Sequence, residues 1–570
     1  MRFVALVTGA VVALAQLAAA ELQTYKWEVT QFDAAFDGVT RKVLGINGNP
    51  GHESPIEAFV GDTIQVWLTN KLKEPTCIHW HGMRQIDTQE MDGASGVTQC
   101  SIQPGKRALY RFIATEESTR WWHSHDNTQY VDGLRGPIII RSKPRLMLPW
   151  EAGVYEDVTV QLAEWYHEQS AVLLAKMMAD PTGNEPVWDT VLVNGRGRFD
   201  CKYVTNGLPC TSKQPLSRIR VKFGKKYRLR LISLAAFAVF DFSIDDHVFQ
   251  VITADGIPVQ PSPLINSIPI NAGQRYDILV EAKPVKKSGS QQRPGGQFWL
   301  RATSLTGSPY TSLPPDQFPK GFNPHGLAII DYDCFGKKEP ASSEWTDKKT
   351  VGEYSFASLR PSNLPAKPQQ RIVVQFTMTS TPTDPVVRGY MSINERPPTS
   401  FEMPMLPTLF EIASGKSVEM LPMSSNAVAM NFGKHVEVVL VNFDAGEHPF
   451  HMHSHAPWVV ASGTAPAASI VAQSPAKLNL RSPMQRDVYT VPGCKVNAVT
   501  GACDEAGYVV LRLNADNPGV WMLHCHIEWH LAMGLAMLLV EGQKELQKKG
   551  LKAFSRSMLN TCGKVYLKDN

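Results

Sequence analysis

Three stretches of similar pattern recur along the chain: Val60–Asn70 (VGDTIQVWLTN), Phe223–Ser233 (FGKKYRLRLIS) and Phe432–Asn442 (FGKHVEVVLVN). Each is a glycine-led turn followed by alternating side chains, which is typical of a strand with one buried face. Similar short runs, separated by Gly, Pro, Asn and Asp, are Thr63–Leu68, Arg107–Phe112, Tyr227–Ile232, Tyr276–Val280 and Val436–Val441. Long helical periodicity is scarce. The sequence therefore predicts an all-β protein of β-sandwiches, and the three copies predict three similar domains.

The chain of 570 residues is too long for one typical domain, and its composition shifts suggest where it divides. A stretch rich in Lys, Ser and Pro reads as a linker before the third domain, and 283–297 reads as a mobile hairpin loop inside the second. The expected parts are domain 1 over 21–148, domain 2 over 149–335, a linker over 336–370, domain 3 over 371–545 and a C-terminal tail over 546–570.

The first twenty residues predict the compartment. A basic Arg2, an apolar run from Phe3 and the small residues Ala18–Ala20 are typical of a secretory signal peptide over 1–20. An N-terminal membrane anchor is the alternative, but the run is barely long enough to span a bilayer. We expect a secreted, extracellular or cell-wall protein with no membrane span in the mature chain.

Charge and cysteine content narrow the class further. Lys plus Arg number 57 against 53 Asp plus Glu, and no basic run is long enough to follow a phosphate backbone, so nucleic acid is not an expected partner. Nine cysteines are an odd number for an oxidising compartment. If Cys525, discussed below, is set aside, the other eight cysteines can form up to four disulfides. The alternative for each of them is a free, buried cysteine. Cys201 with Cys210 and Cys494 with Cys503 are plausible local pairs.

The histidines carry the chemistry. They gather in four clusters: HWHG (His79, His81), WWHSH (His123, His125), HPFHMHSH (His448, His451, His453 and one more) and HCHIEWH (His524, His526, His530). In an extended strand, residues two apart point to the same face, so each His-x-His pair offers two imidazoles side by side. Such pairs hold one metal ion or bridge two.

Cys525 indicates which metal. A thiolate between two histidines, followed five residues later by His530, matches the His2Cys ligand set of a blue copper site, for which His448 is a further candidate. In an extended segment Cys525 points away from the face of His524 and His526. Its sulfur can therefore bind one copper while its neighbours bind others, and the remaining eight histidines match a three-copper cluster in number.

These four motifs, in this order, resemble those of the multicopper oxidase family, which includes laccases, ascorbate oxidases and ferroxidases. Weaker likeness in VLVNGRGRFDC and NAGQRYDILV extends the resemblance through the middle of the chain. It implies three cupredoxin-like Greek-key β-sandwich domains, with the copper cluster between the first and third. It also implies four copper ions: type 1 on His448, Cys525 and His530, type 2 on His79 and His451, and a type 3 pair on His81, His123 and His526 and on His125, His453 and His524. Four single-electron oxidations of a substrate would then reduce O2 to two water molecules.

The resemblance also marks residues beside the copper ligands. Asp92 in EMDG and Glu528 in HCHIEWH resemble the acidic residues beside the cluster, which either relay protons or support ligand histidines. Ten residues after Cys525, the axial position of the type 1 copper is Leu535, which cannot bind the metal. The absent thioether should raise the potential, and it argues against ascorbate as the substrate. Met533 and Met537, which flank Leu535, are expected in the core.

Two candidate substrates stay open. Glu185 and Asp444 resemble the carboxylates with which fungal ferroxidases bind ferrous iron, although either could be a solvated loop acid or turn cap. Phe237 lies where many laccases carry an acid. Iron permease-linked ferroxidases have a C-terminal membrane anchor, and nothing past Glu541 could span a bilayer.

We therefore expect an oxidase of diffusible phenolic or aromatic molecules, a class that includes the phenol-coupling oxidases of pigment and polyketide pathways. Glu185 or Asp444 would then accept the proton of the phenol. A soluble ferroxidase that oxidises Fe(II) to Fe(III) is the alternative. A copper-binding protein without turnover is a third, remote alternative, which O2 uptake would distinguish.

Overall fold

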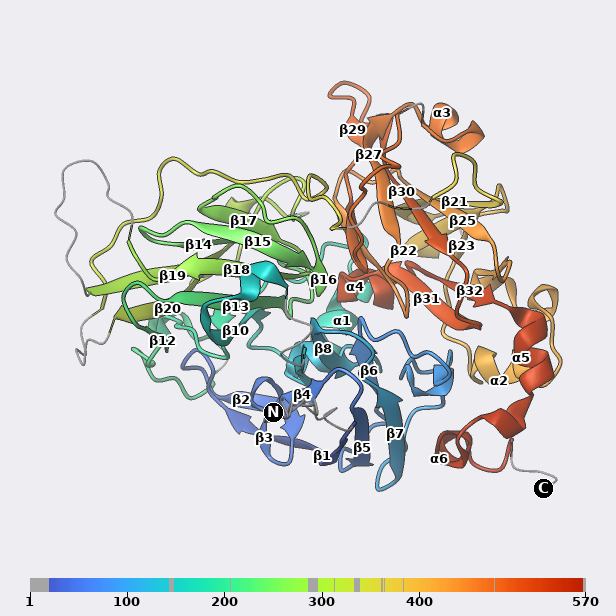
Figure 1. Ribbon diagram of the computed structural model, residues 1–570, viewed down its shortest axis with the longest axis horizontal. Coiled ribbons are helices and arrows are strands. Elements are labelled where there is room, and N and C mark those ends of the chain that lie inside the picture. Colours follow the sequence, from blue (N-terminus) through green and yellow to red (C-terminus); the bar gives the residue numbers. More distant parts are fainter. Residues whose placement is uncertain are drawn as a thin grey trace, which may run out of the picture.

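The computed structural model describes residues 20–142, 148–205, 207–284, 296–311, 313–332, 339–359, 362, 364–382, 384–475 and 477–566. The predicted signal peptide lies outside these residues except for Ala20, and so does most of the predicted loop 283–297. Figure 1 shows three strand-rich bodies, blue, green and orange to red in chain order. Sheet dominates throughout, which confirms the predicted all-β class.

The first body contains two sheets. One has the order β3-β2-β1-β5-β7, with β1 Leu22–Ala34, β2 Arg41–Ile46, β3 Asn49–Pro50, β5 Thr63–Asn70 and β7 Arg107–Ile113. The other has the order β4-β9-β8-β6, with β4 Ile56–Phe59, β6 Ile78–His81, β8 Ser118–Ser124 and β9 Arg135–Arg141. Alternate residues of β5 are buried, so the apolar side of the sheet faces the core, as its sequence predicts.

The second body repeats the plan. Its first sheet, β11-β10-β13-β18-β15-β16, contains β10 Val154–Trp165, β11 Thr190–Val193, β13 Lys226–Ser233, β15 Phe249–Ala254, β16 Ile257–Pro258 and β18 Arg275–Glu281. Its second, β12-β20-β19-β14-β17, contains β12 Ser217–Val221, β14 Phe240–Ile244, β17 Ser267–Ile270, β19 Gly296–Ser304 and β20 His325–Tyr332. Helix α1, Ser170–Ala179, lies between β10 and β11.

The third body also has two sheets. The order β23-β22-β21-β25-β30-β27, with β29 on β30, uses β21 Gln370–Thr381, β22 Asp384–Ile393, β23 Thr399–Ser400, β25 His435–Asn442, β27 Trp458–Ala465, β29 Lys495–Val496 and β30 Cys503–Asn514. The order β24-β32-β31-β26-β28 uses β24 Ala427–Met430, β26 His448–Met452, β28 Val488–Val491, β31 Gly519–Cys525 and β32 Ala536–Glu541. The short helices are α2 Thr408–Ala413, α3 Ala467–Ala472, α4 Glu528–Ala532, α5 Gln543–Lys549 and α6 Arg556–Leu559.

The three repeated stretches occupy equivalent strands. They form β5, β13 and β25, and each pairs in parallel with the long first strand of its body, namely β1, β10 and β21. Each also pairs antiparallel with a later strand, β7, β18 or β30. The internal repeat seen in the sequence is therefore a repeat of sheet position, as expected for three cupredoxin-like domains. The exact boundaries stay predictions.

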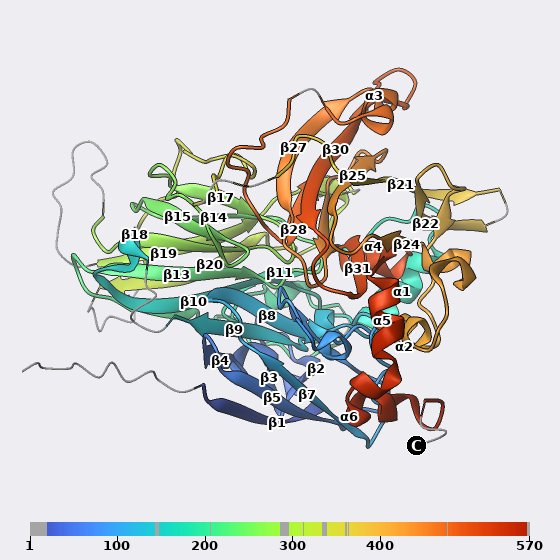
Figure 2. The ribbon, with the colours of Figure 1, turned by 45° about the vertical axis from the view of Figure 1, so that its right-hand side comes forward.

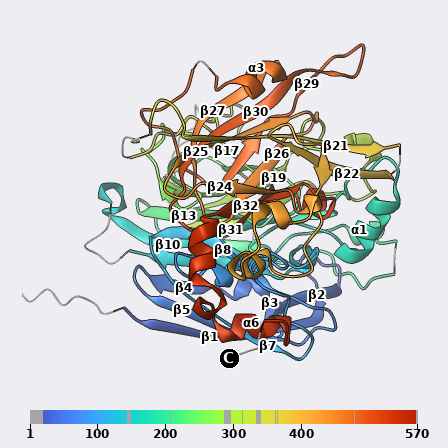
Figure 3. The ribbon, with the colours of Figure 1, turned by 90° about the vertical axis from the view of Figure 1, so that its right-hand side faces the viewer.

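The predicted linker and tail are both packed against the domains. Trp345 donates a hydrogen bond to the Ile244 carbonyl oxygen, and Lys348 pairs with Asp241, so this part of 336–370 lies along domain 2. Further along, Ser362 donates a hydrogen bond to the Leu480 carbonyl oxygen of domain 3. The tail continues through α5 and α6, which run from domain 3 down to domain 1 (Figures 2 and 3). A Cys100–Cys562 disulfide joins the tail to domain 1.

The cysteine predictions are confirmed in part. Cys201 and Cys210 form a disulfide, as expected. The suggested Cys494–Cys503 bond is wrong for this structure, in which both thiols are free although the two residues lie close together. Cys77 is also free and buried, and Cys334 lies outside the described residues.

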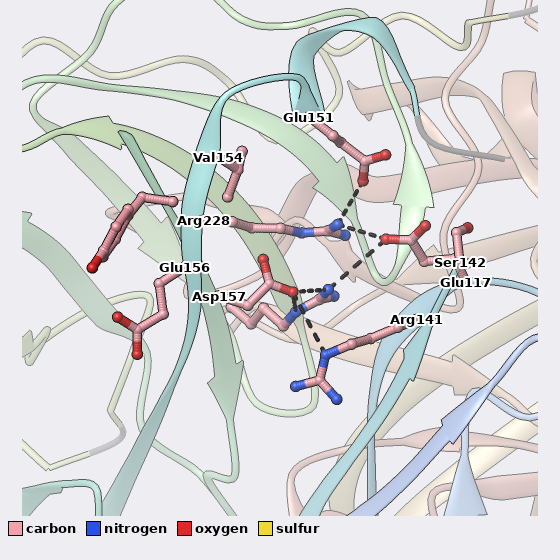
Figure 4. Close-up of a pocket in the computed structure, with 10 residues that line it drawn as sticks. Glu117, Arg141, Ser142, Glu151, Val154, Glu156, Asp157 and Arg228 are labelled. Carbon is pink, nitrogen blue, oxygen red and sulfur yellow. Dashed lines mark hydrogen bonds and ion pairs between the residues drawn. The ribbon is translucent and has the colours of Figure 1, made fainter. Parts of the chain in front are cut away.

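A charged recess of about 430 Å³ lies where domains 1 and 2 meet (Figure 4). Arg228 of β13 lies at its centre, 2.5 Å from Glu117, 2.7 Å from Glu151 and 2.6 Å from Asp277. Arg230 pairs with Asp157 beside it. The recess is thus lined by ion pairs that connect domain 1, the segment before β10 and domain 2. In the described part of the chain, no helix is both long and apolar enough to cross a bilayer.

Candidate copper centres

Paired strands bring the histidine clusters together. In domain 1, β6 and β8 pair antiparallel with His79 opposite His123. In domain 3, β26 and β31 pair with His451 opposite His524, and Phe450 opposite Cys525. Because side chains alternate along a strand, the His-x-His pairs of both domains face one side. That side lies between domains 1 and 3.

Eight buried histidines from the two domains form one group there. Their ring nitrogens form three sets, and within each set the nitrogens lie within 4.8 Å of one another. The sets are His79, His81 and His451; His81, His123 and His526; and His125, His453 and His524. Every ring is almost fully buried. The structure therefore brings together all eight histidines predicted for the cluster.

The hydrogen bonding of these rings fits a metal. His79 and His451 each use Nδ1 to contact a backbone carbonyl oxygen, of Asp92 and Asp487 respectively. Their Nε2 atoms, like those of His123 and His125, are buried without a hydrogen-bond partner among the described residues. An unpartnered buried ring nitrogen is costly unless it binds something, and imidazole is a good ligand for copper. The residues present therefore fit bound copper ions.

Burial also sets the charge of the rings. It holds the pKa of His81, His123 and His125 well below the ordinary value, and neighbouring imidazoles lower it further. These three rings are therefore neutral at physiological pH, which is the form that binds a metal ion.

A separate buried group lies in domain 3. Cys525 Sγ is 3.6 Å from Nδ1 of His448 and 3.6 Å from Nδ1 of His530, and the two nitrogens are 3.1 Å apart. Burial opposes ionisation of the thiol, but the hydrogen bonds with both histidines outweigh it and lower the pKa of Cys525 to about 7. A thiolate between two imidazoles is the ligand set of a blue copper site.

The two groups are joined by the chain itself. His524 and His526, the covalent neighbours of Cys525, belong to the eight-histidine group. The backbone N–H of Cys525 donates to the Leu535 carbonyl oxygen at 3.0 Å, and Leu535 is fully buried. Met533 and Met537 are buried in the core, as expected.

Carboxylates surround both groups. Asp92 accepts a hydrogen bond from Nδ1 of His453 at 2.8 Å, and the two nearby histidines outweigh its burial and lower its pKa. Glu528 is buried at the start of α4, where burial raises its pKa to about 8. Asp487, which sequence reasoning missed, lies 3.1 Å from Nε2 of His81 and pairs with Arg275 of domain 2 at 2.6 Å.

A pocket of about 220 Å³ opens beside the cysteine group. Among its lining residues are Glu185, Phe237, Tyr310, Asp444, Glu447 and His530. Glu185 lies 2.8 Å from Nε2 of His530, and Asp444 lies 3.0 Å from Nε2 of His448. The structure thus places both predicted substrate carboxylates directly on histidines of the cysteine group.

Glu447 is a third acid of this pocket that the sequence reasoning did not select. It accepts a hydrogen bond from Asn271 of domain 2 at 2.9 Å, and burial together with nearby Glu353 raises its pKa to about 7. The fourth histidine of HPFHMHSH, His455, instead lies 3.0 Å from Glu541, away from the three histidine sets.

Comparisons with known proteins agree with this geometry. Family models described as multicopper oxidase match residues 28–145, 156–334 and 392–545. Laccase-1 of Cryptococcus neoformans var. grubii is 31% identical, with 94% of this chain and 83% of the relative covered. The laccase structure from Botrytis aclada is 30% identical with a TM-score of 0.78, covering 95% of this chain and 92% of that one.

The structure of Fet3p, a multicopper oxidase that functions in iron import, is 26% identical with a TM-score of 0.77. The match covers 95% of this chain and 94% of that one. These matches confirm the predicted family and the predicted enzyme class. The chain belongs to the multicopper oxidase family and is a laccase-like oxidoreductase that uses O2 and a reducing substrate.

Proposed function

We propose that this enzyme couples four one-electron oxidations of a diffusible phenolic or aromatic substrate to the reduction of O2 to two water molecules. One observation carries the proposal. Cys525 belongs to a buried His–Cys–His group beside a surface pocket, while its two covalent neighbours belong to the separate eight-histidine group. A donor site and an acceptor site are thereby connected through two peptide bonds.

The ligand sets divide between four copper ions. His448, Cys525 and His530 would hold the type 1 ion, and His79 and His451 the type 2 ion. The type 3 pair would be held by His81, His123 and His526 and by His125, His453 and His524. When bound, these ions supply one-electron transfer and together store the four electrons that O2 takes up.

The pocket residues orient the substrate and accept its proton. Phe237, Tyr310 and Ile527 offer apolar surface, and Glu185 and Asp444 offer carboxylate oxygens near His530 and His448. A phenol that loses an electron becomes a strong acid, so a carboxylate within hydrogen-bond reach acts as general base. Glu185 is our first choice, because the His530 ring that it contacts lines the same pocket.

The acids near the eight-histidine group serve O2 reduction. Asp92 holds the ring of His453 in place through its hydrogen bond to Nδ1, which leaves Nε2 for the metal. Glu528 is buried close to Tyr130, whose ring lies against His123 and His526, so we propose that it passes protons toward that group.

Oxidation of Fe(II) is the second candidate. The hydrogen bonds of Glu185 and Asp444 to His530 and His448 support it, because hard oxygen ligands suit iron and each acid would place it one contact from the type 1 site. The likeness to Fet3p supports it as well. Steady-state kcat/KM values for Fe(II) and for a panel of phenols, measured on one copper-loaded preparation, decide between the two. We expect phenols to be preferred, and a preference for Fe(II) would overturn the proposal.

Cys525→Ser tests the donor site. Removing the thiolate should abolish the blue colour and turnover while the eight histidines retain their share of copper. Visible absorption and copper content per chain measure this. A variant that stays blue would refute the type 1 assignment.

We also propose that the protein enters the secretory pathway. The signal-like residues 1–20 and the two disulfides support this, since disulfides persist in oxidising compartments. N-terminal sequencing of protein from the culture medium should find a mature chain that starts near Glu21.

A further inference from the structure

Glu164 of strand β10 has a buried carboxyl group, and the residue is only 1% exposed. Its Oε1 accepts hydrogen bonds from the backbone N–H groups of Ala236 at 2.6 Å and Phe237 at 3.1 Å. Its Oε2 is buried and has no hydrogen-bond partner among the described residues. Arg135 lies close by, but its guanidinium donates to the backbone carbonyl oxygens of Glu164 and Leu234. The carboxyl group is therefore held through one of its oxygens.

These contacts fit a protonated acid. An ionised carboxylate without a hydrogen-bonded counter-charge is costly to bury, so such a group keeps its proton. Burial accordingly raises the pKa of Glu164, and nearby Arg135 and the two N–H groups only partly offset this. In the protonated form Oε1 is the carbonyl oxygen that accepts both N–H groups, and Oε2 is the hydroxyl. Glu164 therefore carries a proton on the oxygen that no other described residue binds.

One short backbone segment brings Glu164 close to Tyr130. The Tyr130 hydroxyl donates to the carbonyl oxygen of Ala235 at 3.5 Å. That carbonyl belongs to the same peptide group as the Ala236 N–H that Glu164 binds, so the two side chains lie at opposite ends of one peptide group. The next carbonyl oxygen, of Ala236, accepts the backbone N–H of Glu528 at 2.8 Å. The acid, the tyrosine hydroxyl and the start of α4 thus meet on two successive peptide groups.

Tyr130 is influenced by both acids. Burial raises the pKa of its hydroxyl well above the ordinary value, and the carboxyl groups of Glu528 and Glu164 raise it further. Tyr130 therefore stays neutral, and it can pass a proton on only if it takes one up at the same time. Its ring centroid lies 5.0 Å from that of His123, a member of the eight-histidine group. Tyr130 thus links the surroundings of Glu164 to that group.

Tyr166 ties the same face of β10 to α4. It lies two residues along the strand from Glu164, and so on the same face. Its hydroxyl accepts a hydrogen bond from Trp529 Nε1 at 3.2 Å, and its pKa is raised by burial and further by Glu164. Among the described residues, Arg135, Tyr130 and Tyr166 are the titratable groups whose pKa Glu164 shifts.

We propose that Glu164 is a further proton-carrying residue for O2 reduction. A proton leaves Oε2 of Glu164 for the hydroxyl oxygen of Tyr130, which at the same time gives up its own proton on the side of the eight-histidine group. Solvent returns a proton to Glu164, so the residue is unchanged after each cycle. Each O2 takes up four protons with four electrons, and a buried site needs carriers to receive them. This inference rests on the proposed reduction of O2 to water at that group.

Glu164→Gln removes the carried proton but keeps the anchoring hydrogen bonds, because the amide oxygen can still accept from Ala236 and Phe237. The copper-loaded variant is fully reduced without O2 and then mixed with O2, and the return of the blue absorption is followed by stopped flow. Reoxidation should be slower than in the parent by about 10-fold or more, as for the loss of a proton-transfer group. The loss should grow as the pH rises, and the solvent deuterium isotope effect should increase. Oxidation of ferrocyanide by the blue site without O2 should be unchanged.

Glu164→Asp separates proton transfer from a structural role. Aspartate keeps a carboxyl group but shortens the side chain, so it weakens the anchoring hydrogen bonds more than glutamine does. If Glu164 carries protons, aspartate should restore part of the reoxidation rate that glutamine loses. A structural role predicts the opposite order.

Glu90→Gln is the matched control. Glu90 is also a buried glutamate whose pKa is raised by burial, and its Oε1 accepts a backbone N–H, from Ser555 at 3.0 Å. This variant should reoxidise as the parent does. Copper content and the urea midpoint check that all three variants are loaded and folded.

A parent-like rate and pH profile in Glu164→Gln would overturn the inference. Slower reoxidation in Glu164→Asp than in Glu164→Gln would overturn it as well, because the role would then be structural. Failure of the proposed function looks different, since the reduced parent itself would not regain its blue colour with O2.

Discussion

The resemblance to multicopper oxidases marks Leu535 as the residue that, if it were methionine, would supply a weak thioether ligand to the proposed type 1 copper. Its side chain is fully buried, and its carbonyl oxygen is fixed by the Cys525 amide. Leu535→Met should add a sulfur ligand that stabilises the oxidised type 1 copper and lowers its potential. Redox titration of the blue absorption measures the shift, with Met537→Leu as a control that should leave it unchanged. An unchanged potential in Leu535→Met would mean that another group occupies the axial place.

Changing the Glu185 carboxylate should affect the oxidation of phenols and of Fe(II) differently, so it distinguishes the two candidate substrates. In Glu185→Gln the side chain keeps its size but can no longer take up a proton. If phenols are native, their kcat/KM should fall about 100-fold or more, in line with general-base catalysis, while a donor that releases no proton, such as ferrocyanide, should change little. If iron is native, Glu185→Ala combined with Asp444→Ala should depress Fe(II) oxidation far more than phenol oxidation. Equal losses for the two substrates would remove the iron candidate.

At the scale of strands, alternation of side chains was enough to predict most of what the structure shows. The strand predictions hold at β5, β7, β13, β18 and β25, and the two-residue spacing correctly put His79 with His81 on one face. Asp487 could not be found in this way, because it lies far from the other motifs and stands in no repeat. Its contact with His81 exists only once β28 is placed against domain 1.

Disulfide pairing between distant cysteines could not be predicted from the sequence either. The Cys100–Cys562 bond joins residues 462 positions apart, and nothing in the local sequence of either cysteine selects its partner. Local spacing favoured Cys201 with Cys210, which is bonded, and Cys494 with Cys503, which is not. Proximity along the chain is therefore a partial guide to disulfides.

Strand β13 contributes a testable element of domain assembly. Arg228 is buried and neutralises Glu117, Glu151 and Asp277 at once, so Arg228→Met should leave buried carboxylates without their counter-charge. We expect a loss of about 3–5 kcal/mol of stability, seen as a lower urea midpoint. Lys42→Met is the control: its ion pair with Asp33 lies outside the recess, is exposed and should be worth about 0–1 kcal/mol. Equal losses of stability in Arg228→Met and in the control would show that the buried ion pairs of the recess stabilise the protein no more than an exposed pair does.

At the scale of the whole molecule, the copper sites depend on how three domains are held together. The proposed ligands come from domains 1 and 3, while domain 2 contributes Arg275 to Asp487 and Asn271 to Glu447. Asp255 of domain 2 also binds Arg486 of domain 3 through both oxygens. Domain 2 therefore holds Asp487, which contacts the proposed ligand His81, although the described structure places none of the eleven proposed ligands in it.

The contact between domains 1 and 2 should respond to acid through His52. Its ring packs against Phe36 and so closely on Gly195, at φ +69°, that a Cβ there would collide with it. Burial, with help from Arg135 and Arg196, lowers the pKa of His52 to about 4. An unfolded histidine takes up its proton near pH 6.5, so the unfolded state binds more protons between these two values. The contribution of His52 to the free energy of unfolding is therefore fully present above about pH 6.5, and it falls by roughly 3 kcal/mol as the pH drops to about 4.

His52→Gln isolates that contribution. Copper ligands also take up protons in the same range, so the readout is the difference between parent and variant in urea midpoint at pH 7 and at pH 4.5. The variant should lose less stability on acidification than the parent, whatever its stability at pH 7, because glutamine does not titrate. His435→Gln, at the start of β25 and away from this contact, is the matched control for a histidine-to-glutamine replacement. Parallel curves for the parent and His52→Gln would show that protonation of this ring does not govern how domains 1 and 2 stay joined.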